Sequence, residues 1–168
     1  MHPYVELATA AIRAYATTGK KIPSPEPLPE DMKRPAGVFV SLKKHGELRG
    51  CIGTIFPATH SLAAEIIANA VASSSFDPRF PPVDSSELGE LSVSVDVLSE
   101  PSPVSDVSTL DARKFGVIIS TKTKRGLLLP DIEGVDTAAE QIAICRRKGG
   151  IGPFEKAEIE RFTVARYK

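Results

Sequence analysis

The sequence has 168 residues, with 21 Lys and Arg balanced by 21 Asp and Glu, 42% hydrophobic residues and no tryptophan. Such a chain is expected to fold as one domain, or as two small lobes, burying about 68–70% of its unfolded surface. The neutral net charge argues against nucleic-acid binding, and no run approaches the ~20 apolar residues of a membrane span. No secretory signal opens the chain, so we expect a cytoplasmic protein whose two cysteines stay reduced.

The first third of the chain predicts a helix, a loop and a hairpin. Apolar residues recur at helical spacing over 4–18, and Gly19 is typical of a helix end. The many prolines that follow exclude regular structure, so residues of about 20–36 are predicted to wrap the core as a loop. The β-rich runs 37–42 and 48–55 are joined by five residues that include a glycine, which predicts a hairpin.

A second helix, a stiff loop and an alternating strand follow. Apolar spacing predicts a helix over 61–74. The segment 76–82 is rich in proline and carries two phenylalanines, so we expect a non-helical loop that its rings anchor to the core. Residues 91–97 alternate between apolar and polar side chains, which predicts a strand in one sheet with the strand of Cys51 and with its apolar side facing helices.

The last third predicts a second hairpin over 115–129, a helix that begins with the capping-box pattern at Thr137 and ends at Gly149, and a final strand over 158–167. The fold class is therefore α+β, with a mixed or antiparallel sheet and helices packed on it. Two hairpins, each followed by a helix, suggest an internal duplication, although no residue-level repeat accompanies it.

The stretch from Leu48 to Gly53 places a thiol and a guanidinium two residues apart between glycines. Gly50 and Gly53 inside a strand indicate a bulge or close approach by a ligand or another backbone. Arg49 and Cys51 would project from one face of a regular strand, where the cation would favour a reactive thiolate. A bulge would change this, and Cys51 can equally serve as a small core residue.

Three further residues are candidates for this site. His60 lies across a turn from Cys51 and can fold back as a base, or it is an ordinary surface histidine. Arg79 on the stiff loop suits a carboxylate or phosphate, or it pairs with Asp77 and braces the loop. We expect its guanidinium to lie within one side chain's reach of the Cys51 strand. The histidines and cysteines do not have zinc-site spacing, and no phosphate or dinucleotide fingerprint is present, so no metal or cofactor is predicted.

Four ordered motifs stand out: Gly37-Val38-Phe39-Val40, Leu48-Arg49-Gly50-Cys51-Ile52-Gly53, Asp77-Pro78-Arg79-Phe80-Pro81-Pro82 and Arg125-Gly126-Leu127-Leu128-Leu129-Pro130. Together they resemble the AMMECR domain family, whose prokaryotic branch is the A component of the AmmeMemoRadiSam system. The resemblance spans nearly the whole chain and implies one AMMECR-type domain over 1–168, with a main lobe and a smaller lobe. It also implies Memo-like and radical SAM proteins as partners. Asp131 and Gly149 depart from the family pattern, which leads us to expect glutamine and alanine there.

Two hypotheses follow. In the first, the protein is a cytoplasmic component of unresolved activity that acts with these partners as an interaction module. In the second, it is a small enzyme in which Cys51 is the nucleophile or a ligand contact, and Arg49 and Arg79 orient an anionic substrate. The candidate residues are Cys51 and His60 for catalysis, and Arg49, Gly50, Gly53, Asp77, Arg79 and Arg125 for binding.

Overall fold

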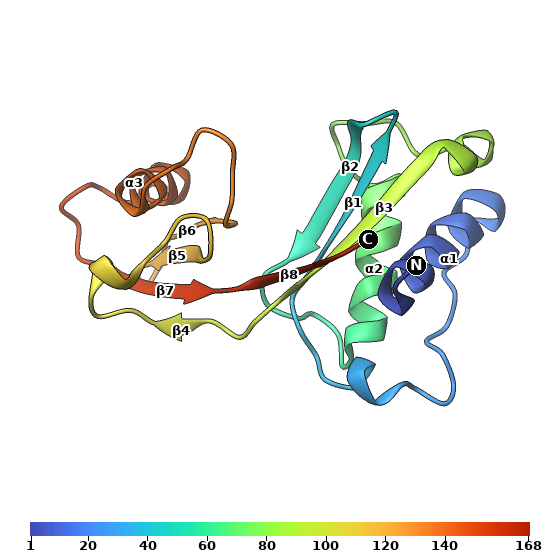
Figure 1. The fold of residues 1–168 in the computed structure, drawn as a ribbon, viewed down its shortest axis with the longest axis horizontal. Helices are drawn as coiled ribbons and strands as arrows, with labels where there is room; N and C mark the ends of the chain where they lie inside the picture. The colour runs from blue at the N-terminus through green and yellow to red at the C-terminus, as the bar shows by residue number, and fades with distance from the viewer. The chain divides into compact units, whose positions relative to one another are not determined.

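The computed structural model describes residues 1–168 and divides them into two compact units. The first unit comprises Met1–Leu98 and Ala165–Lys168, and the second comprises Ser99–Val164. Each unit has its own four-stranded sheet with helix packed against it (Figure 1). The predicted α+β class, with antiparallel pairing, is confirmed.

The sheet of the first unit has the strand order β2-β1-β3-β8. Its strands are β1 (Val38–Lys44), β2 (Glu47–Thr54), β3 (Leu91–Leu98) and β8 (Val164–Tyr167). The prediction that the alternating strand and the Cys51 strand share one sheet is confirmed. The helices α1 (Pro3–Thr18) and α2 (Leu62–Ser75) pack against one face of this sheet.

That covered face holds the core of the first unit. Val38, Val40 and Leu42 of β1 and Val95 of β3 are fully buried there, in one cluster with side chains of α1 and α2. Alternation along β1 sends Phe39, Ser41 and Lys43 to the opposite face, which no helix of this unit covers. We call this opposite side the uncovered face.

The connections of the first unit differ in detail from the predictions. The hairpin turn between β1 and β2 is only His45-Gly46, because both residues have positive φ (52° and 85°) and give a turn whose twist matches the strands. The proline-rich loop includes one short 3₁₀ helix, η1 (Glu30–Met32), and a second one, η2 (Ser85–Glu90), precedes β3.

The sheet of the second unit has the strand order β4-β7-β5-β6. Its strands are β4 (Ser102–Pro103), β5 (Gly116–Ser120), β6 (Arg125–Leu128) and β7 (Glu158–Phe162), and a short 3₁₀ helix, η3 (Val107–Thr109), lies between β4 and β5. Helix α3 (Ala138–Gly149) begins with the predicted capping box and packs on β5 and β6. The predicted final strand is in fact two strands, β7 and β8, which belong to different sheets.

The two units repeat one construction, as the hairpins suggested. In each, a hairpin is followed by a helix and a third strand, and the orders β2-β1-β3 and β6-β5-β7 correspond. A glycine in the second strand of each hairpin meets the carbonyl end of the helix: a Cβ would lie 2.2 Å from the Ser73 carbonyl oxygen at Gly50, and 1.8 Å from that of Cys145 at Gly126. Only glycine permits so close an approach of helix and strand.

Candidate functional site

A β-bulge diverts Arg49 from Cys51. The pairing of β1 with β2 shifts by one residue between Leu42 and Lys43, so Arg49 has no partner in the register. Its guanidinium donates to both carboxylate oxygens of Glu87, at 3.1 and 3.0 Å, and to the Pro81 carbonyl at 2.9 Å. Arg49 holds the pKa of Glu87 down to about 2. It therefore fastens η2 and the loop before it to β2, and is not directed at a ligand beside the thiol.

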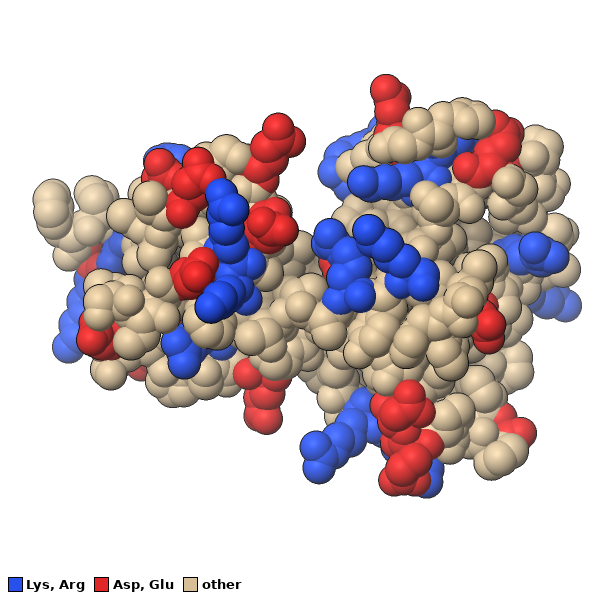
Figure 2. Space-filling model, in the orientation of Figure 1, with Lys and Arg blue, Asp and Glu red and all other residues tan.

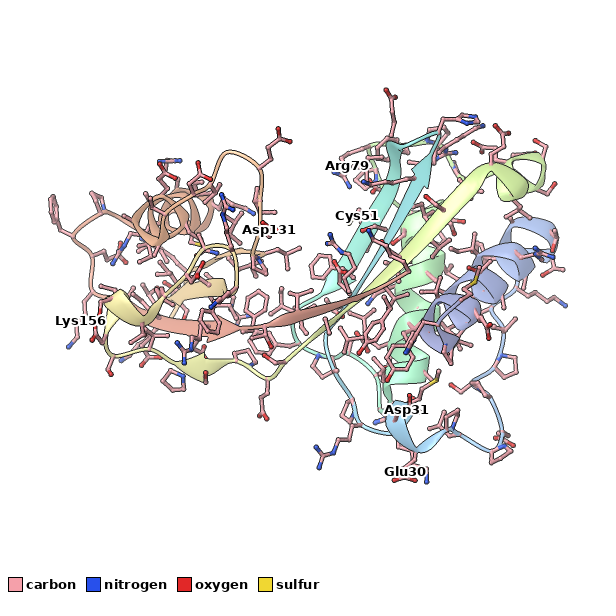
Figure 3. All side chains as sticks on the ribbon, viewed as in Figure 1. Glu30, Asp31, Cys51, Arg79, Asp131 and Lys156 are labelled. Carbon is pink, nitrogen blue, oxygen red and sulfur yellow. The ribbon has the colours of Figure 1, made fainter.

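Arg79, in contrast, does reach the Cys51 strand, as predicted. Its Nη2 donates to the Cys51 carbonyl at 3.1 Å and to Asp77 Oδ2 at 2.8 Å. Asp77 Oδ2 in turn accepts the Cys51 backbone N–H at 3.0 Å, and Oδ1 accepts the N–H and Nε of Arg79, each at 3.0 Å. The Arg79 bonds hold the pKa of Asp77 well below its usual range. Figure 3 shows Arg79 and Cys51 in the same part of the first unit.

This cluster satisfies the outer edge of β2 and explains why the loop is ordered. β2 is an edge strand, so the N–H and C=O of Cys51 that face away from β1 need other partners. Asp77 and Arg79 supply both. The prediction that both aromatic rings anchor the loop is wrong for Phe76, which is 61% exposed. The buried carboxylate of Asp77 anchors the loop instead.

The thiol of Cys51 lies on the uncovered face. Cys51 is paired with Ser41 across the hairpin, and Sγ lies 3.2 Å from the Ser41 hydroxyl. Two residues along, Gly53 makes room for the ring of Phe39, because a Cβ there would lie 2.2 Å from the ring. Cys51 itself is half-buried. Gly53 thus serves packing, while the Cys51 and Ser41 side chains stay at the surface of the sheet.

A groove of about 290 Å³ runs along this face beside the Cys51–Ser41 pair. It is lined by residues of β1, β2 and β3 and by the end of the chain: Ser41, Lys43, Leu48, Ser92, Val93, Ser94, Arg166 and Lys168. Three hydroxyls and three cations therefore surround one hollow. Figure 2 shows Lys and Arg side chains gathered over the strands of the first unit. We call this the uncovered-face groove.

The three cations of the groove are held differently. Arg166 donates through Nε and Nη2 to the two oxygens of the buried Asp96, both at 2.7 Å, and is fixed against β3. Lys43 and Lys168 take part in none of the ion pairs of the structure. One guanidinium is thus pre-positioned by a carboxylate, whereas the two lysines have no carboxylate partner.

One other candidate, His60, is not brought into this site. His60 is exposed and lies just before the start of α2. Cys51 lies beside the other end of that helix, where the Ser73 hydroxyl accepts the N–H of the neighbouring Ile52. Along α2, Leu62 and Ser73 are eleven residues apart, or about 17 Å at 1.5 Å per residue, and His60 lies beyond the Leu62 end. His60 is therefore too distant to act as a base on Cys51. Arg125 begins β6 in the second unit.

Sequence reasoning missed a buried polar stripe on α2. Glu65, Asn69 and Ser73 are spaced four residues apart and are all buried. Ser73 donates to the Val40 carbonyl at 2.7 Å, Asn69 donates to the Val38 carbonyl at 3.0 Å, and Glu65 accepts the N–H groups of the turn after β2. The signal was present in the sequence: polar residues at i, i+4 and i+8 on an otherwise apolar helix.

No group of three or more His, Cys, Asp or Glu side chains is placed to hold a metal ion. Helices long and apolar enough to cross a membrane are absent.

The fold and its motifs define a two-unit α+β protein in which a glycine-flanked cysteine lies on an edge strand. A family model described as AMMECR1 matches residues 5–167, and the chain belongs to this family. A protein of Thermotoga maritima is 53% identical over 99% of this chain and 98% of its own. A protein of Clostridium acetobutylicum is 48% identical over 99% of this chain, which spans only 36% of that relative.

The fold is also that of a solved structure. The crystal structure of an uncharacterized protein from Pyrococcus horikoshii has a TM-score of 0.85 and 33% identity, covering 97% of this chain and 88% of that one. Neither this protein nor the two relatives above are named for an activity.

Proposed function

We propose that the protein is a ligand-binding component of a cytoplasmic multi-protein system, and that the uncovered-face groove binds a small molecule with a carboxylate or phosphate group. The observation that carries this proposal is the pair of unpaired lysines, Lys43 and Lys168, beside a hollow that also presents hydroxyl groups. An anion in the groove would gain charge-assisted hydrogen bonds without first breaking an ion pair of either lysine.

The groove offers both charge and orientation. Ser41, Ser92 and Ser94 follow one another across β1 and β3 and can donate to the same anionic group or to a neighbouring polar part of the ligand. Leu48 supplies an apolar contact at one side of the groove. This combination, a few polar groups around a partly apolar hollow, is typical of small-molecule sites.

Cys51 is a ligand contact in this proposal, and not a nucleophile. Its Sγ has the Ser41 hydroxyl as its hydrogen-bond partner, while Asp77 and Arg79 bind its backbone. A nucleophilic thiol needs a base or a cation directed at sulfur. Arg49 is held by Glu87 instead, so the geometry supports binding more than covalent catalysis.

The wider system follows from the family resemblance. Memo-like and radical SAM proteins are the partners it implies, and the cytoplasm is the compartment in which we expect them to act together. The Clostridium relative supports an association with other protein parts, because it carries this domain within a chain almost three times as long.

The test is an NMR titration of the full chain with inorganic phosphate and, separately, with succinate at low salt. We expect backbone amide shifts concentrated at 41–43, 92–94 and 166–168. Lys43→Ala and Lys168→Ala should each weaken binding about tenfold, while Lys21→Ala, an exposed lysine outside the groove, should not. The proposed site would be refuted if neither anion caused amide shifts. It would also be refuted if the three substitutions weakened binding equally.

A further inference from the structure

The second unit presents an apolar surface that the proposed function does not use. Residues Ala139, Ile142 and Ala143 of α3, with Ile151 and Pro153 of the segment that follows, line a hollow of about 340 Å³ with Arg146 and Arg147 at its rim. Beside it, the Phe154 side chain is 99% exposed. In Figure 1 the segment after α3 loops away from the helix before it enters β7. We call this the α3 surface.

A ring exposed to this degree makes almost no contact within the folded unit. An isolated exposed apolar residue is common, but Phe154 directly follows Pro153, which lines the apolar hollow, and aromatic residues are enriched at protein interfaces. The segment that bears Phe154 is held in place: Arg146 Nη1 donates to the Gly152 carbonyl at 2.7 Å and to the Glu155 carbonyl at 2.9 Å. The ring is thus presented by a braced turn.

We infer that the α3 surface binds a second copy of this chain in a two-fold symmetric dimer, with Phe154 of each copy entering the hollow of the other. The inference is independent of the uncovered-face groove. A projection and a hollow on one surface are what a two-fold interface needs, because each copy supplies both parts to the other.

The charges of α3 favour the same occupant. Its first turn carries Glu140 and its last turn carries Arg146, Arg147 and Lys148. When two copies of α3 pack antiparallel about an axis near Ala143, Glu140 of one copy lies opposite Arg147 of the other, and the opposite ends attract. Parallel packing would place like charges together. Opposite charges at the two ends thus select an antiparallel pair of identical helices.

Sedimentation equilibrium of the full chain from about 1 μM to about 1 mM tests this inference. We expect a reversible dimer whose dissociation constant rises at least tenfold in Phe154→Ala and in Arg147→Glu. Phe76→Ala, which removes another exposed ring in the first unit, is the matched control and should leave the dimer unchanged. A chain that stays monomeric throughout, or a dimer that Phe154→Ala does not weaken, would overturn the inference.

A cysteine cross-link tests the orientation. Ala143→Cys should form a covalent dimer under mild oxidation because the two side chains would face each other near the axis. Thr123→Cys, an exposed position on the turn between β5 and β6, should not. Equal cross-linking of the two variants would exclude the antiparallel α3 pair. A different, acidic partner would then be the occupant of the α3 surface.

Discussion

Removing the carboxylate of Asp77 should destabilise the first unit by detaching the loop from the edge of β2. The side chain is only 2% exposed and accepts from the backbone of Cys51 and from Arg79. A hydrogen bond to a charged acceptor contributes about 1.5–3 kcal/mol, whereas the pair with Arg79 adds about 0–1 kcal/mol because that guanidinium is half exposed. We expect Asp77→Ala to lower the free energy of unfolding by about 2–4 kcal/mol.

The assay is urea unfolding followed through NMR signals of β1 to β3, so that the first unit is measured separately from the second. Glu47→Ala, which removes an exposed carboxylate at the start of β2, is the control and should cost no more than about 0.5 kcal/mol. An Asp77→Ala protein whose free energy of unfolding lies within about 1 kcal/mol of the parent value would refute the edge-anchoring argument.

The pH dependence gives an independent check. Because the pKa of Asp77 is lower in the folded protein, its contribution is present above the ordinary aspartate pKa of ~3.9 and is lost as the pH falls through the folded value. The stability difference between parent and Asp77→Ala should therefore be constant from about pH 5 to 8 and shrink below about pH 4. A difference that grows at low pH would contradict the sign of this linkage.

Two further changes test the packing of β2 and the state of the cysteines. Gly50→Ala should destabilise the first unit by about 1–3 kcal/mol or more in urea unfolding, because its Cβ would overlap the Ser73 carbonyl. Gly89→Ala is the control and should not destabilise the unit, because the space around Gly89 is open. Equal effects of the two substitutions would contradict the packing argument. Alkylation of the native protein should label Cys51 and spare Cys145, since burial raises the pKa of Cys145 to about 11. Mass-spectrometric mapping that finds both cysteines labelled at equal rates would contradict this prediction.

The elements that sequence could predict are those whose signal is local. Helical spacing ended by Gly19, the capping box at Thr137 and the alternation of 91–97 each depend on neighbours within a few residues, and all three are confirmed. The predicted reach of Arg79 to the Cys51 strand also holds, because a proline-stiffened turn limits where its guanidinium can lie.

The site was harder to predict because its contacts join distant parts of the chain. Arg49 is turned away by a bulge and by Glu87, a residue 38 positions later. Arg166 comes to the groove only because β8 pairs beside β3, a pairing that no local pattern announces. The structure therefore offers cations for an anion near Cys51, as expected. They are Lys43, Arg166 and Lys168, and not the two arginines of the sequence motifs.

Because the two units share one construction, a comparison of equivalent positions shows which residues the fold itself requires. Gly50 and Gly126 occupy equivalent places, so the residue after each glycine and its cross-strand partner are equivalent too. In the first unit that pair is Cys51 with Ser41; in the second it is Leu127 with Ile118. An apolar pair thus satisfies the same hairpin, helix and strand arrangement. The fold does not demand a thiol and a hydroxyl at this position, and their presence only beside the uncovered-face groove favours a role in binding there.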